Sequence, residues 1–165
     1  AILTEVKALE QVGYSFEAAG GSLELLIRRT LGEAVRPWNL HEYHCSFRHY
    51  KDGHAPVCEA TVKLDVGDKP NLTVSEGHGV VNALDGALRK ALQPFFAELD
   101  RVQLIDYKVR IIDGGEATAA KTRVLIVHTD GEETWGTVGV SNSIIEASWI
   151  ALTDGLDLFL QKRDS

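Results

Sequence analysis

Two short segments rich in glycine and serine carry the residues best suited to hold a ligand. Each follows a predicted strand and opens a predicted helix: residues 76–79 (EGHG) and residues 139–143 (GVSNS). Free backbone N–H groups and the positive end of the helix dipole favour an anion such as a carboxylate there. Glycine also lets a ligand approach the backbone closely. A tight turn followed by a helix cap explains the same residues, so both interpretations stay open.

The histidines and the nucleophilic side chains do not form a catalytic or metal-binding pattern. His41, His44 and His49 are close in sequence, but strand side chains three residues apart point to opposite faces, so His41 and His44 do not share an ion. No G-x-S-x-G segment places a serine in a strained turn, and Ser141 and Ser143 at a helix start are explained by capping. We therefore expect no catalytic residue and no metal site.

The two segments belong to a longer repeat that returns after sixty-four residues. Residues 40–43 (LHEY) return as 104–107 (LIDY), and residues 77–83 (GHGVVNA) align with 141–147 (SNSIIEA). Thr73-Val74 likewise returns as Thr137-Val138. Two similar units are typical of a symmetric binding module, because ligand pockets form readily where such units meet.

The elements that position these segments follow from the period of the apolar residues. Residues 1–13 are predicted to be helical and to stop at Gly13. A second helix is predicted to be capped by the Ser22 hydroxyl and closed by Gly32. From Leu40 the period changes from 3.6 to 2, and the order strand–strand–strand–helix then occurs twice.

This order predicts an α+β fold of two βββα units, with an antiparallel sheet, helices packed on one face and a helical linker in front. The predicted boundaries are a linker subdomain over residues 1–36 and a main domain over 37–165, with repeats over 39–98 and 101–162.

Composition narrows the classes of partner and compartment. The net charge of −7 argues against a nucleic-acid-binding face, and no apolar run approaches the roughly 20 residues of a membrane span. Without a signal-peptide pattern we expect a cytoplasmic protein. Cys45 and Cys58 are too few for a disulfide scaffold and are expected to be reduced. The start at Ala1 inside a helical pattern and the lack of Met indicate a piece of a longer chain.

Three segments resemble the C-terminal allosteric domain of the α-isopropylmalate synthase family, most of all its citramalate synthase branch. They are residues 76–92 (EGHGVVNALDGALRKAL), 104–120 (LIDYKVRIIDGGEATAA) and 137–152 (TVGVSNSIIEASWIAL). The resemblance implies a homodimer that binds a branched-chain amino acid for feedback inhibition. The effector is isoleucine in citramalate synthases, which we favour, and leucine in isopropylmalate synthases; a purely structural dimerisation module is the further alternative.

The resemblance also implies a parent enzyme and an effector site. The parent condenses acetyl-CoA with a 2-oxo acid in a metal-dependent (β/α)₈ barrel of the same chain. That barrel is not in this sequence, so we expect no catalysis and no cofactor here. The implied effector-binding residues lie in the two turns and in the strands between them: Gly77, His78, Gly79, Val81, Asn82, Leu104, Tyr107, Ile111, Ala117, Ala119, Val124, Asn142, Ser143 and Ile144.

The sequence departs from the family's commonest pattern at two places that bear on effector selectivity. His78 stands where the family frequently has Asn, and Asn142-Ser143 where it has Glu-Asn or Pro-Asn. Distinguishing isoleucine from leucine means moving one methyl group, worth about 1–3 kcal/mol in an apolar slot.

Overall fold

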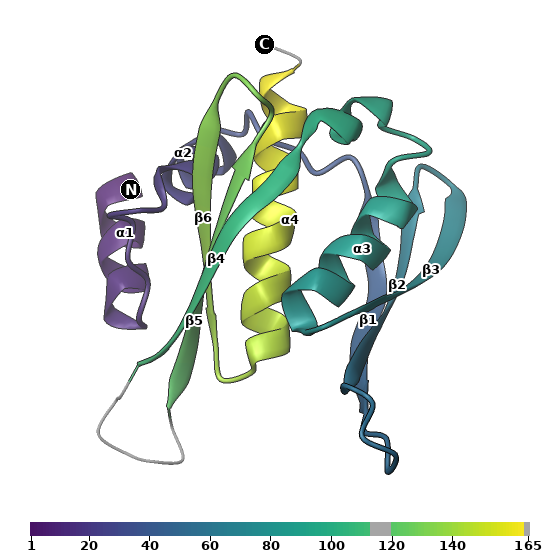
Figure 1. The fold of residues 1–165 in the computed structure, drawn as a ribbon. Coiled ribbons are helices and arrows are strands. Elements are labelled where there is room, and N and C mark those ends of the chain that lie inside the picture. The colour runs from purple at the N-terminus through teal and green to yellow at the C-terminus, as the bar shows by residue number, and fades with distance from the viewer. Residues whose placement is uncertain (113–119, 164–165) are drawn as a thin grey trace. The chain divides into compact units, whose positions relative to one another are not determined.

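The computed structural model describes residues 1–112 and 120–163 of the chain (Figure 1). It has two compact units, one of Arg36–Asp100 and the other of Ala1–Val35 with Arg101–Ser165. The helices are α1 (Ile2–Gln11), α2 (Gly20–Thr30), α3 (Val80–Leu92) and α4 (Ile144–Lys162), with a 3₁₀ turn, η1 (Ala97–Arg101). The strands are β1 (Asn39–Arg48), β2 (Val57–Val66), β3 (Lys69–Gly77), β4 (Gln103–Ile112), β5 (Lys121–Thr129) and β6 (Thr134–Ser141). The predicted α+β fold, with its βββα repeat and helical N-terminal part, is confirmed.

The unit of residues 36–100 is one antiparallel sheet, in the order β1-β2-β3, with α3 packed on one face. The alternation seen in the sequence sets that face: Ala60, Val62 and Leu64 of β2 are buried, while the residues between them are half-buried or exposed. Gly67, at a φ of 64°, makes the tight turn into β3.

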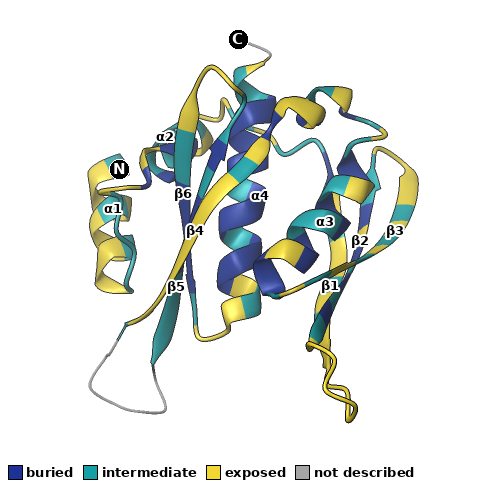
Figure 2. Ribbon diagram, in the orientation of Figure 1, coloured by how far each residue is buried: buried dark blue, intermediate teal, exposed yellow. Residues whose placement is uncertain are grey.

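The other unit has the same design in the order β4-β5-β6, with α4 packed on β5 and β6. Val124 and Ile126 of β5 are buried on the face towards α4. Figure 2 shows that α4 is buried along most of its length, whereas β4, an edge strand, is exposed along almost all of its own.

The sixty-four-residue repeat extends to individual hydrogen bonds. The Thr73 hydroxyl donates to the Ala87 carbonyl at 2.7 Å, and the Thr137 hydroxyl donates to the Ala151 carbonyl at 2.6 Å. Each bond ties the third strand of a unit to its helix at the same place. A register shift also interrupts each first strand pair at one equivalent point, between residues 40 and 42 and between residues 104 and 106.

The N-terminal segment packs on the unit that contains α4. The predicted N-cap role of Ser22 is wrong: α2 begins at Gly20 without a side-chain cap, and the Ser22 hydroxyl instead accepts a bond from the Val138 N–H at 2.8 Å. Val138 lies on β6, whose outer edge has no strand partner in its sheet. Since an edge strand presents unpaired backbone groups, tertiary contact decides what this serine binds.

Candidate functional site

The first predicted ligand-binding turn lies in the unit of residues 36–100, where β3 ends and α3 begins. Gly79 is the N-cap of α3, in an extended conformation, and no side chain caps this helix start. His78 and Asn82 are exposed, whereas Val81 is buried and packs into the unit. The first backbone N–H groups of α3 therefore have no side-chain acceptor among the described residues, which suits an anionic group.

The second turn lies in the other unit, between β6 and α4, and it is self-capped. The Ser143 hydroxyl accepts from the Glu146 N–H at 3.5 Å, and the Ser141 hydroxyl accepts from the Ser143 N–H at 3.1 Å. Asn142 and Ile144 are exposed beside them. The capping interpretation of Ser143 therefore holds at α4, while at α3 the N–H groups are open. The two copies differ in this respect although their backbones follow the same course.

The exposed apolar side chains of β4 form a row on the face of the sheet that carries α4. Tyr107 pairs with Ile126, and Ile111 pairs with Thr122, so both project to the same side as the buried residues of β5. They stay 45% and 76% exposed because α4 packs on β5 and β6. Val109, two residues from each, is exposed in the same row. The described residues of the unit leave the row from Tyr107 to Ile111 as an uncovered apolar surface.

Some of the predicted site residues of this unit share one end of the sheet. Ile111 is in register with Thr122, and Thr122 with Ser141, which places the end of the apolar row level with the start of α4. Leu104 is half-buried at the other end of β4, and Val124 is fully buried beneath α4. Ala117 and Ala119 lie outside the described residues. The effector-binding set as a whole stays a prediction.

The thiols and the clusters of metal-ligating side chains do not offer a reactive centre. Burial raises the pKa of Cys45 to about 12 and also raises the pKa of Cys58, so both remain protonated at neutral pH and are poor nucleophiles. Within residues 1–112 and 120–163, no three His, Cys, Asp or Glu side chains are grouped to hold a metal ion. None of the described helices is both long and apolar enough to cross a membrane.

Sequence reasoning missed two features of this unit. It predicted no site among the outward side chains of β4 and β5, although Lys108, Arg110 and Arg123 line one cavity. It also did not predict the register shift at Leu104–Asp106. Both depend on which residues face each other across two strands, and the alternation within a single strand does not contain that information.

Comparison with known proteins places this arrangement in a family. Residues 17–160 match the LeuA allosteric (dimerisation) domain. The chain is 49% identical to an (R)-citramalate synthase of Aquifex aeolicus over 161 residues. The matched region is 98% of this chain and 30% of that protein. The chain is 44% identical over 163 residues to an (R)-citramalate synthase of Geobacter sulfurreducens, with 99% and 31% covered.

A more distant match links the chain to a second enzyme of the same family. A 2-isopropylmalate synthase of Aquifex aeolicus is 30% identical over 116 residues, which cover 69% of this chain and 20% of that protein. The chain spans about 30% of the length of the first two relatives. Because the family match covers both βββα units and the α2 segment, the chain belongs to the LeuA allosteric (dimerisation) domain family.

Proposed function

We propose that this chain is the regulatory domain of a citramalate synthase-type, acetyl-CoA-dependent acyltransferase. It binds a branched-chain amino acid, with isoleucine favoured, as a feedback inhibitor. In this proposal the domain forms a homodimer and acts on a catalytic barrel that precedes it in the same parent chain. The family match and the names of the relatives support the regulatory role.

The uncovered apolar row of β4 is the observation that carries the effector proposal. Tyr107 and Ile111 are exposed on the sheet face on which Val124 and Ile126 of the neighbouring strand β5 are fully buried. An aliphatic side chain of about four carbons covers such a row and removes it from water, at roughly 25 cal/mol for each Å² of apolar surface. The phenolic hydroxyl of Tyr107 adds one polar contact at its edge.

The charged groups of the amino acid need separate partners. A carboxylate suits the α3 start, where Gly79 leaves the first backbone N–H groups without a side-chain cap. Asn82, exposed in the first turn of α3, offers an amide oxygen to the ammonium group. The α3 start and the β4 row belong to different units, so each is a separate candidate surface for the effector and is tested with its own variant.

Binding becomes regulation only if the effector's affinity differs between two states of the dimer. Within one unit, residues 1–35 are joined to β6 by the bond from Val138 to Ser22. This segment lies N-terminal to the effector domain and is therefore the proposed route to the barrel.

Isothermal titration calorimetry of the chain with isoleucine, leucine and valine tests the proposal. We expect one of the three to bind best and to stabilise the fold by about 2.7 kcal/mol at a hundredfold excess over Kd. Tyr107→Ala and Asn82→Ala should each weaken binding while the protein stays folded and keeps its oligomeric state. Leu72→Ala is the control, because Leu72 is also an exposed apolar strand residue and lies outside the predicted site.

The alternatives give different results. Best binding of leucine would identify the domain as leucine-responsive, in keeping with the 2-isopropylmalate synthase relative. If no amino acid releases heat or raises the unfolding temperature, and Tyr107→Ala dissociates the dimer, the β4 row is an interface and the domain is a structural dimerisation module.

A further inference from the structure

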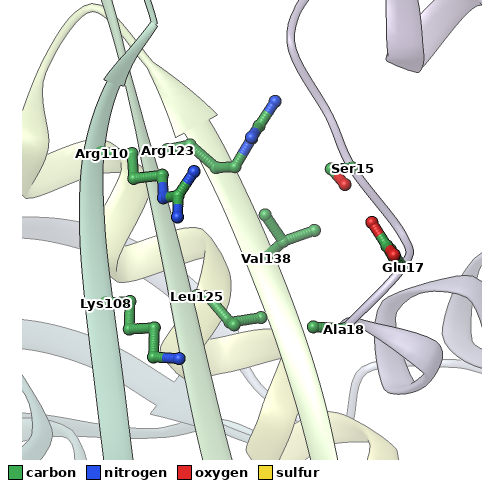
Figure 3. Close-up of a pocket in the computed structure, with 8 residues that line it drawn as sticks. All are labelled: Ser15, Glu17, Ala18, Lys108, Arg110, Arg123, Leu125 and Val138. Atoms are coloured by element: carbon green, nitrogen blue, oxygen red, sulfur yellow. The ribbon is translucent and has the colours of Figure 1, made fainter.

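A cavity of about 280 Å³ lies between the outer face of the β4–β6 sheet and the segment that connects α1 to α2. Figure 3 shows Lys108 and Arg110 extending from β4, and Arg123 from β5, into the space that the connecting segment bounds on its other side. The apolar side chains of Leu125 and Val138 also line it. All of these residues belong to one unit.

The charge of this cavity is opposite to that of the protein. Among the described residues, three cations and one carboxylate, Glu17, line it, an excess of two positive charges in a chain of net charge −7. Arg110 and Arg123 pair directly across the two strands, and like charges in that position destabilise a sheet. Among the described residues, no carboxylate forms an ion pair with Lys108, Arg110 or Arg123. An anion in the cavity would relieve this repulsion.

The first repeat provides an internal comparison. The residues of the other unit that correspond to Lys108, Arg110 and Arg123 are His44, Ser46 and Glu59. That face contains one arginine, Arg48, and it is neutralised within the unit by Glu59 at 2.7 Å and Glu76 at 2.9 Å. The cationic cluster is therefore not a general property of the fold; it occurs in the copy that carries the connecting segment.

The wall of the cavity is held in place from both sides. The Arg123 Nε donates to the Gly13 carbonyl at 2.8 Å, which fixes the guanidinium against the connecting segment. On β6, the buried bond from the Val138 N–H to Ser22 joins the sheet to α2. Tyr14 and Phe16 pack against the buried cluster of Ala19, Val138 and Val140 beside the cavity. The cations are thus presented by anchored elements, which lowers the cost of ordering them around a ligand.

We propose that this cavity binds a small organic dianion, a dicarboxylate or a phosphate ester. Lys108 and Arg110 contact the negative groups, with the guanidinium taking one of them through two parallel N–H bonds. Leu125 and Val138 contact the hydrocarbon part, and the Ser15 hydroxyl donates from the connecting segment. The site is distinct from the proposed amino-acid site, because Lys108 and Arg110 alternate with Tyr107 and Ile111 and so lie on the opposite face of β4.

Titration calorimetry of the 165-residue chain at constant ionic strength tests this, with malate as the dicarboxylate and glycerol 3-phosphate as the phosphate ester. We expect one of the two to bind at a single site and to raise the unfolding temperature. Arg110→Gln should weaken that binding about tenfold or more, because it removes a charged hydrogen-bonding partner. Arg48→Gln is the matched control: Arg48 is an exposed strand arginine on the face that is already neutralised.

The titrations distinguish a dicarboxylate site, a phosphate-ester site and the absence of specific anion binding. Stronger binding of malate assigns the site to dicarboxylates, and stronger binding of glycerol 3-phosphate assigns it to phosphate esters. The proposal is overturned if neither anion binds beyond the ionic-strength control, or if Arg110→Gln and Arg48→Gln weaken binding equally. Tyr107→Ala should leave anion binding unchanged, so this proposal and the amino-acid proposal fail independently.

Discussion

Two buried serines in helices should respond differently to the same substitution, because only one of them holds a buried N–H. The Ser22 hydroxyl accepts a bond from the buried Val138 N–H at 2.8 Å. Ser22→Ala leaves that N–H without an acceptor, which costs about 1–3 kcal/mol. Alanine has a higher helix propensity than serine, which offsets less than about 0.7 kcal/mol of that cost. We expect Ser22→Ala to lower the free energy of unfolding by about 1–2 kcal/mol, or the unfolding temperature by about 2–4 °C for each kcal/mol.

Ser148 is the matched control, because it is also fully buried in a helix. Its hydroxyl has no hydrogen-bond partner among the described residues. Ser148→Ala removes a desolvated polar group without orphaning another, so it should be neutral or stabilising by up to about 1 kcal/mol.

Urea unfolding followed by tryptophan fluorescence suits this comparison. Trp135 and Trp149 lie in the same unit as both serines, so the signal reports mainly on that unit. If both substitutions shift the midpoint in the same direction by similar amounts, the bond between α2 and the edge of β6 is not the cause.

Three further predictions concern close packing, the repeated hydrogen bonds and pH. Gly139→Ala should destabilise the fold by about 2 kcal/mol or more in thermal unfolding, because a Cβ would overlap a carbonyl oxygen of α4. Gly79→Ala should be near neutral in the same assay, because a Cβ there meets nothing within 4 Å. Thr137→Val removes the bond to the Ala151 carbonyl and should lower the free energy of unfolding in urea by about 1 kcal/mol. Thr73→Val should lower it by less, because Thr73 is only half-buried. Equal decreases for the two variants would contradict this. Backbone N–H bonds in the β5–β6 turn lower the pKa of Asp130 below its ordinary value of 3.8. Its carboxylate therefore adds stability that is present above pH 3.8 and lost as the pH falls through the lowered pKa. The decrease in urea midpoint caused by Asp130→Ala should therefore become smaller as the pH falls through that range. A decrease that does not change with pH would contradict the reasoning.

The parts of the fold that sequence predicted well are those set by local period and by turns. The alternation of Ala60, Val62 and Leu64 along β2 requires one buried face, and the burial of these residues follows it. Gly13 and Gly32, predicted as helix stops, both adopt a positive φ. These signals lie within a few residues of the element they define, so one chain segment is enough to read them.

The parts that failed depend on partners far away in sequence. Ser22 has the residue type and position of a helix cap, yet its acceptor role is decided by Val138, 116 positions later. The facing pair Arg110 and Arg123 is invisible without the β4–β5 register. In the candidate site, by contrast, the capping of α4 by Ser143 was predicted, and Gly79 at the start of α3 has no side chain that could cap that helix.

The two copies also solve one packing problem in opposite ways, which shows what the duplication had to keep. In each unit the third strand lies against its helix so closely that one position admits no side chain. In the first copy the glycine is on the helix, where a Cβ on Gly86 would overlap the Ser75 side chain of β3. In the second copy it is on the strand, where a Cβ on Gly139 would overlap the backbone of α4 and crowd Ile150.

Ser75 and Gly139 are equivalent positions, as are Gly86 and Ile150. The close approach of strand and helix was therefore retained while the residue that permits it changed sides. The retained approach also carries the threonine-to-carbonyl bond at the same place in both units. The outer faces of the two sheets differ. There one copy became self-neutralised around Arg48, while the other collected Lys108, Arg110 and Arg123 beneath the connecting segment. A fixed strand–helix layer with free outer faces lets one duplicated unit acquire a binding surface that its twin does not have.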